Sequence, residues 1–169
     1  MTSQDGVPGG GRGGDPVAAR LIGLLIRRGL TVAAAESLTG GLITATLTTV
    51  PGASAVVRGG VVAYAADVKA SMLGVERDLL DRRGTVDRDV AIAMARGAME
   101  RLGAAAAVAA TGVAGPDPAE GHPVRTVHIA ACVGELVRHQ ALALNGDREE
   151  IRRRTVERAL SLLTGLLTD

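Results

Sequence analysis

The sequence predicts an α/β fold in which a mixed sheet lies between helical layers, and three observations lead to this prediction. Segments with the apolar spacing of helices alternate with short strands along most of the chain. The strands are nearly uninterrupted apolar runs, which is typical of strands that are buried on both faces. The last two strands form a hairpin, so an antiparallel pair is added to a sheet that is otherwise built from crossovers.

The composition predicts one globular domain that does not bind nucleic acid. The chain has 169 residues, of which 47% are hydrophobic and 22% are charged. A chain of this length buries enough surface to fold without a disulfide or a structural metal. Its single cysteine, Cys132, excludes an intrachain disulfide and fits a reducing compartment. The formal net charge of +1 argues against a strongly basic nucleic-acid surface.

Residues 1–15 differ in composition from the rest of the chain. They are rich in glycine and contain no apolar segment of signal-peptide length, so we expect a disordered tail followed by a single domain over residues 16–169. No apolar run reaches the length of a membrane span. We therefore expect a cytoplasmic protein that does not associate with membranes. The oligomeric state, including a homo-oligomer, stays open.

The first half of the chain predicts short elements that are separated by glycine-rich turns. A helix is expected over residues 16–28, because Asp15 provides an N-cap before Pro16 and Gly29 follows the last apolar position. The next elements are, in order, a strand over 31–35, a helix from residue 42 to about residue 48, a turn over 50–54, a strand over 61–64, a short connection over 65–73 and a short helix over 77–82.

The second half predicts one long helix, a strand, a hairpin and a final helix. The strand over 104–110 is expected despite the helix propensity of alanine, because Gly103 ends the preceding helix and Thr111-Gly112 ends the run. The remaining elements are a helix over 88–101 after the N-cap Asp87, a hairpin of strands over 126–133 and 136–144, and a helix from Asp147 to about residue 167.

The stretch Ala33–Gly41 is the first candidate for a functional site. A buried strand runs into a glycine-rich turn and then into a helix, so backbone N–H groups and the positive helix end converge there. An anion or a developing oxyanion would be stabilised at this point, beside the hydroxyl of Ser37. The alternative is structural, because Ser and Thr before a helix are commonly N-caps.

Lys69 is the second candidate, because it is the only lysine among 19 basic residues. Arginine supplies charge and surface coverage equally well, but it cannot be deprotonated in a protein. A retained amine is therefore a candidate proton acceptor. Two alternatives remain open at this stage: a lysine on a solvated face, and a charged lysine that binds a phosphate.

Three predicted strands end in polar clusters, which contain Ser37, the segment from Tyr64 to Lys69, and Thr111-Gly112. In open α/β sheets, ligands bind outside the carboxyl ends of the strands, so parallel neighbours would bring the three clusters into one crevice. Serine needs a base, and none of the three histidines stands in an obvious triad pattern. A Ser37–Lys69 pair with a glycine-rich oxyanion hole would perform acyl transfer or amide hydrolysis.

Other chemistries find little support in the sequence. It contains no HExxH, no CxxC and no close His/Asp cluster, so we expect neither a metal nor an organic cofactor. Neither glycine-rich loop is a Walker A motif or a dinucleotide fingerprint. Tyr64 lies five residues before Lys69 and is interpreted as a site residue, with a surface tyrosine at a strand end as the alternative.

Taken together, these segments resemble the CinA C-terminal-domain family, whose enzymatic members are nicotinamide-nucleotide amidohydrolases. The resemblance extends from about Leu21 to Leu163. It rests on six segments in family-like order, namely Ala35–Gly41, Pro51–Ser54, Gly59–Tyr64, Val68-Lys69, Leu73–Val75 and Thr111–Pro116.

The resemblance implies a three-layer α/β/α sandwich that converts nicotinamide mononucleotide to nicotinate mononucleotide and ammonia, a step of pyridine nucleotide salvage. It implies that Ser37 is the nucleophile, that Lys69 is its base, and that Tyr64 and Thr111 help to form the site. The expected substrate-binding residues are Glu36, Thr39, Gly40, Gly41, Gly112, Gly115 and Arg125. The alternatives are a catalytically idle nucleotide-binding module of the same fold and a hydrolase of another small amide.

The chain departs from the family pattern at several positions. Leu38 stands where a cysteine is common, and Ala65-Ala66-Asp67 replaces a more polar segment. Asp117-Pro118 replaces further glycine, and Arg125 stands where glycine is usual. A cation at residue 125 would either bind the phosphate of the substrate or obstruct the pocket, and the sequence does not decide between these roles.

Overall fold

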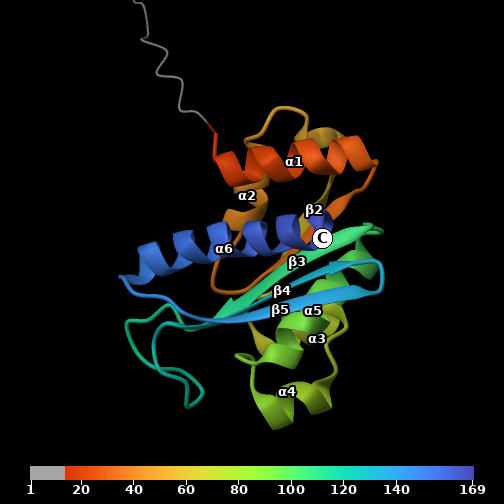
Figure 1. Cartoon of the computed structure of the whole chain (residues 1–169). Coiled ribbons are helices and arrows are strands. Elements are labelled where there is room, and N and C mark those ends of the chain that lie inside the picture. The colour runs from red at the N-terminus through yellow and green to blue at the C-terminus, as the bar shows by residue number, and fades with distance from the viewer. Residues whose placement is uncertain (1–13) are drawn as a thin grey trace, which may run out of the picture.

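The structure is a computed structural model that describes residues 14–169, so the predicted tail lies almost entirely outside the described residues. A five-stranded sheet in the order β2-β1-β3-β4-β5 forms its centre (Figure 1). The strands are β1 (Val32–Glu36), β2 (Val57–Val62), β3 (Ala106–Gly112), β4 (Thr126–Val133) and β5 (Leu136–Ala143). β1 pairs in parallel with both β2 and β3, whereas β4 and β5 pair antiparallel. The predicted mixed sheet is confirmed.

Helices cover both faces of the sheet, as Figure 1 shows. One layer contains α1 (Pro16–Arg28), α2 (Leu42–Thr48) and α6 (Arg148–Thr168), and the other contains α3 (Ala66–Leu73), α4 (Arg77–Arg83) and α5 (Arg88–Arg101). Each layer packs its apolar side chains onto the sheet as a separate hydrophobic cluster. No helix within residues 14–169 is both long enough and apolar enough to span a membrane.

Small side chains allow the helices to approach the sheet closely. All five residues of β1 are buried, and three of them are alanines. On α5, a Cβ atom added at Gly97 would overlap the carbonyl oxygen of Leu73 at the end of α3. The absence of a side chain at Gly97 therefore sets the position of α3, the helix that carries Lys69.

The segment over residues 65–73 differs from the prediction, because it is the helix α3 and not an irregular connection. Only Lys69 and Leu73 are buried on this helix, one turn apart, and the remaining residues give little contrast between its faces. Gly74 ends the helix in the left-handed conformation with a φ of 67°. The sequence did not predict this helix, because its buried face contains a lysine where an apolar residue would be expected.

Two strand boundaries also differ from the prediction. β2 begins at Val57 and includes Gly59 and Gly60, which the sequence analysis placed before the strand. Residue 60 must be a glycine, because a Cβ atom there would overlap the side chain of Thr44 on α2. β3 ends at Gly112, so Thr111 and Gly112 belong to the strand and not to the loop after it.

Candidate active site

Ser37 and Lys69 come together at the carboxyl end of the sheet. Ser37 follows β1 directly, and its backbone N–H donates to the carbonyl oxygen of Ala110 on β3 at 3.0 Å. Lys69 reaches the same point from α3, in the opposite helical layer from α2. Its Nζ lies 3.1 Å from Oγ of Ser37, across 32 positions of sequence. Because β1 pairs in parallel with both β2 and β3, these three strands end at the same edge of the sheet, and the contact forms there.

The Lys69 amine is enclosed by three hydrogen-bond partners and has no exposed surface. Besides Ser37, its Nζ contacts the carbonyl oxygens of Ala63 at 2.8 Å and Tyr64 at 3.1 Å. A neutral amine fits this arrangement, because two N–H groups donate to the two carbonyls and the lone pair accepts from the Ser37 hydroxyl. A charged ammonium would donate to all three oxygens and retain no N–H for a phosphate.

Burial changes the proton affinity of this amine. Desolvation lowers the pKa of Lys69 from 10.5 to about 8, against a smaller opposing effect of the Glu120 carboxylate, which raises it. A substantial fraction of the amine is therefore unprotonated at mildly alkaline pH. Because the side chain is fully buried, the interpretation of Lys69 as a residue on a solvated face is wrong.

The turn after Ser37 has two backbone donors without an acceptor. Gly40 N–H donates to the carbonyl of Ser37 at 3.0 Å, and Gly40 and Gly41 adopt positive φ values of 58° and 102°. In the part of the chain that the structure describes, the N–H groups of Leu38 and Thr39 have no acceptor. These are the two unpaired backbone donors nearest to Ser37 in sequence, and because Leu38 and Thr39 are both buried, an oxyanion could reach them only in a site closed around the substrate.

The carboxylate of Glu36 supports α2 and is not free to bind a substrate. It is fully buried and accepts hydrogen bonds from the N–H groups of Gly41, Ile43 and Thr44 at 2.8–3.0 Å, and from the Thr44 hydroxyl at 2.7 Å. A negative charge at this end of a helix is favourable. The structure therefore places Glu36 as the cap of α2, which is the role that the sequence analysis considered for Ser37 and Thr39.

Substitution Glu36→Gln is expected to destabilise the fold, because one of the two acceptor oxygens is replaced by a donor amide that faces backbone N–H groups. We expect the free energy of unfolding to fall by about 2–3 kcal/mol. Chemical denaturation of this variant measures the loss. Glu157→Gln, at an exposed position of α6, is the matched control. Equal stability of the two variants would contradict the capping role.

The second glycine-rich segment contributes close packing. The Thr111 hydroxyl is buried and donates to the carbonyl of Thr85 at 2.7 Å, so it ties β3 to the turn before α5. A Cβ atom at Gly112 would lie 2.7 Å from the Thr126 carbonyl oxygen, and one at Gly115 would lie 2.7 Å from a methyl group of Val124. These three residues therefore fix the end of β3 and the loop that follows it. The Thr39 hydroxyl is also buried, and it has no hydrogen-bond partner among the described residues.

Arg148 contacts two of the predicted site residues, Tyr64 and Gly115, and the sequence analysis did not identify it. One of its guanidinium nitrogens lies 3.1 Å from the Tyr64 hydroxyl, and the other donates to the carbonyl of Gly115. Tyr64 itself is 62% exposed, and its main-chain carbonyl is the group that contacts Lys69. The available signal was the position of Arg148 directly after the N-cap Asp147 of α6.

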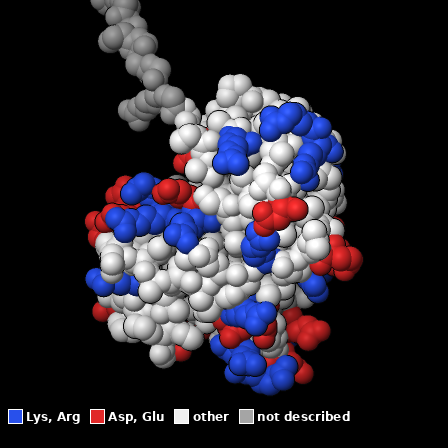
Figure 2. All heavy atoms as spheres, in the orientation of Figure 1, with Lys and Arg blue, Asp and Glu red and all other residues white. Residues whose placement is uncertain are grey.

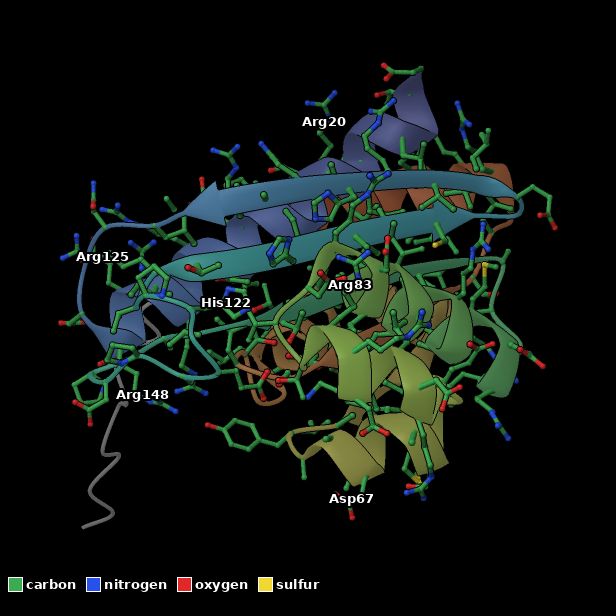
Figure 3. The ribbon with its side chains drawn as sticks, turned by 90° about the horizontal axis from the view of Figure 1, so that it is seen from below. Arg20, Asp67, Arg83, His122, Arg125 and Arg148 are labelled. Carbon is green, nitrogen blue, oxygen red and sulfur yellow. The ribbon has the colours of Figure 1, made fainter. Side chains whose placement is uncertain are left out.

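Arg125 and Arg148 line one cavity at the same end of the molecule (Figure 3). The cavity has a volume of about 680 Å³ and is otherwise lined by Ala114, Pro116, Pro123, Val124, Gly146 and Asp147. Arg125 is exposed and donates to the side-chain oxygen of Asn145 at 3.2 Å. Arg148 contacts the hydroxyl of Tyr64, whose main-chain carbonyl binds Lys69, but neither Ser37 nor Lys69 lines the cavity itself.

Basic side chains gather over the N-terminal half of α6 and over α1 on the face that Figure 2 shows. The first two turns of α6 include Arg148 and Arg152, which are four residues apart and lie on one side of the helix.

Within residues 14–169, no group of three or more His, Cys, Asp or Glu side chains is placed to hold a metal ion.

Comparisons with known proteins agree with this architecture. The family model described as "CinA C-terminal domain" matches residues 14–167. A CinA-like protein of Frankia casuarinae is 48% identical over 153 residues, which are 90% of this chain and 35% of that protein. A CinA-like protein of Gemmatimonas aurantiaca is 43% identical over 154 residues, which are 90% of this chain and 36% of that protein. The chain spans about a third of the length of these curated relatives.

Solved structures show the same fold. The competence/damage inducible protein CihA from Agrobacterium tumefaciens superposes with a TM-score of 0.86 at 43% identity, over 89% of this chain and 93% of that one. A competence-damaged protein (CinA) superfamily protein from Escherichia coli superposes with a TM-score of 0.86 at 31% identity, over 89% of this chain and 88% of that one. The chain therefore belongs to the CinA C-terminal domain family.

Proposed function

We propose that this chain is a serine amidohydrolase that deamidates nicotinamide mononucleotide to nicotinate mononucleotide and ammonia, without a metal or an organic cofactor. The observation that supports this proposal most strongly is the contact of 3.1 Å between the Ser37 hydroxyl and the buried Lys69 amine. A neutral amine at this distance can accept the serine proton as the nucleophile attacks.

In the first half of the reaction, Oγ of Ser37 forms a bond to the carboxamide carbon while its proton moves to Nζ of Lys69. The carbonyl oxygen becomes an oxyanion, for which the N–H groups of Leu38 and Thr39 are the available donors. The C–N bond then breaks, and Lys69 returns the proton to the leaving nitrogen. Ammonia leaves and an ester on Ser37 remains.

In the second half of the reaction, water attacks the ester and Lys69 accepts one of the water protons. The C–O bond to Ser37 breaks, and the proton on Lys69 returns to the serine oxygen. The products are the pyridine carboxylate and the free dyad. Ala63 and Tyr64 keep the amine in place through both halves, because their carbonyls bind its remaining N–H groups.

The cavity beside Arg148 is the proposed site for the rest of the nucleotide. Its volume of about 680 Å³ lies within the usual range for small-molecule sites. The guanidinium groups of Arg125 and Arg148 border it and can bind a phosphate with bidentate geometry. The proposal therefore assigns Arg125 to phosphate binding and not to obstruction of the pocket.

The proposal is tested by measuring ammonia release from nicotinamide mononucleotide by the purified chain. We expect ammonia and nicotinate mononucleotide in equal amounts. A rise in melting temperature with the nucleotide but without ammonia would identify a binding module. Ammonia from another small amide alone, in a substrate panel, would retain the dyad and overturn the substrate.

A further inference from the structure

The Ser37 turn is held from its outer side by a single guanidinium group. Arg152 on α6 donates from Nε to the carbonyl of Leu38 at 2.9 Å and from Nη2 to the carbonyl of Thr39 at 3.1 Å. Its side chain is half-buried and crosses 114 positions of sequence to the first of these contacts. No other side chain among the described residues donates to either carbonyl.

This contact determines where one backbone donor points. The carbonyl of Leu38 and the N–H of Thr39 belong to the same planar peptide unit, so they point in opposite directions. Arg152 pulls the carbonyl towards α6, which lies on the sheet face that also carries α1 and α2. The Thr39 N–H is thereby directed away from α6, and Lys69 enters the site from the opposite layer.

The same turn leaves little else to fix this peptide. Gly40 and Gly41 follow it with positive φ values, and the N–H of Thr39 has no acceptor within the described residues. The Thr39 carbonyl accepts from Leu42 N–H at 3.1 Å, so one of the two carbonyls has a backbone partner as well. The carbonyl of Leu38 depends on Arg152 for its hydrogen bond.

We infer that Arg152 is a positioning residue, which holds the Leu38–Thr39 peptide so that the Thr39 N–H faces the reacting carbonyl of a substrate bound at Ser37. The inference rests on the proposed amidohydrolase function, because it assigns the oxyanion donor of that reaction. Arg152 makes no hydrogen bond to Ser37 or Lys69 among the described residues, and it acts through the two backbone carbonyls that it binds.

The test compares Arg152→Gln and Arg152→Lys with Arg153→Gln, a neighbouring exposed arginine whose side chain makes no hydrogen bond within residues 14–169. Removal of an oxyanion donor lowers kcat by about 100- to 1,000-fold, and a donor that is misplaced but still present should lower it less, by about 10- to 100-fold. We expect this loss in Arg152→Gln, with KM within about twofold of wild type and with the same pH midpoint, since the contacts of Lys69 are unchanged. Arg152→Lys replaces the planar fork, whose Nε and Nη2 each bind one carbonyl, by a single ammonium nitrogen that cannot reproduce both contacts in the same geometry, so we expect its kcat to fall by about fivefold or more.

A second measurement does not depend on the substrate. An alkyl fluorophosphonate reacts with an activated serine, and its phosphoryl oxygen occupies the oxyanion position while fluoride leaves. We expect the rate of Ser37 labelling to fall in Arg152→Gln by the same factor as kcat. If wild type labels but releases no ammonia, the proposed substrate fails, and the labelling rates still decide the role of Arg152.

The inference would be overturned if Arg152→Gln had the same kcat and the same labelling rate as wild type. It would also be overturned if this variant had a raised KM and an unchanged kcat, because that result indicates direct binding of the substrate. If Arg152→Gln does not fold at the assay temperature, Arg152→Lys decides. A kcat of Arg152→Lys equal to that of wild type would overturn the inference. A lower kcat at the alkaline plateau of the pH profile, with an unchanged pH midpoint, would support it.

Discussion

Substitution Ser37→Ala is expected to reduce ammonia release by about 10⁴- to 10⁶-fold, to the level of the uncatalysed reaction plus a small residue from binding. The variant lacks the oxygen that forms the bond to the carboxamide carbon. Its fold should persist, because the hydroxyl contacts only the Lys69 amine and the turn is held by backbone hydrogen bonds. Steady-state ammonia assays measure the rate, and thermal unfolding measures the fold.

The matched control for this variant is Ser54→Ala, which removes an exposed hydroxyl from the turn Ala53–Ala55. We expect it to retain the wild-type rate. Binding of the nucleotide by Ser37→Ala should also persist. An activity of Ser37→Ala within tenfold of wild type would exclude Ser37 as the nucleophile.

Substitution Lys69→Arg is expected to reduce the rate by at least about 10³-fold, because a guanidinium group keeps the charge but cannot accept the serine proton. Arginine is also larger than the fully enclosed lysine side chain. Lys69→Met is therefore the second variant, since it preserves length without the amine. If both variants lose activity to a similar extent and keep melting temperatures close to that of wild type, the loss is due to the missing proton acceptor and not to misfolding.

The two substitutions should not add. Because Ser37 and Lys69 act as one unit, the double variant Ser37→Ala/Lys69→Met is expected to be no slower than Ser37→Ala alone. A further large loss in the double variant would show that Lys69 contributes to catalysis independently of Ser37. Residual activity of Lys69→Arg above about a tenth of wild type would refute the role of the amine as base.

Much of the fold could be predicted because sequence pattern and tertiary structure agree there. The Asp15-Pro16 start and the Gly29 end of α1 are local signals, and the structure contains both, with the Asp15 carboxylate accepting two N–H groups. The apolar run of β1 predicted a buried strand, and all five of its residues are buried. Helix α3 could not be predicted, because its inward face is set by Lys69, whose burial depends on contacts with Ser37 and Ala63.

The site was predicted to the extent that rare residue types mark it. A single lysine in an arginine-rich chain pointed to Lys69, and a glycine-rich turn pointed to Ser37. Arg148 and Arg152 were not identified, because arginine is common in this chain and their hydrogen-bond partners lie far away in sequence. Glu36 was assigned to substrate binding from the resemblance alone, and its capping role could not be predicted because the N–H groups that it binds become neighbours only when α2 has formed.

The central claim is that an unprotonated Lys69 amine accepts the Ser37 proton, and the pH dependence of ammonia release tests it most directly. With a pKa of about 8, the neutral and competent fraction of the Lys69 amine falls about tenfold per pH unit below this value and approaches one above it. We expect the rate of ammonia release to rise about tenfold per pH unit below pH 8 and then to level off, and we expect Lys69→Met to lack this rise. A wild-type rate that stays constant between pH 6 and pH 9, or falls over that range, would contradict it.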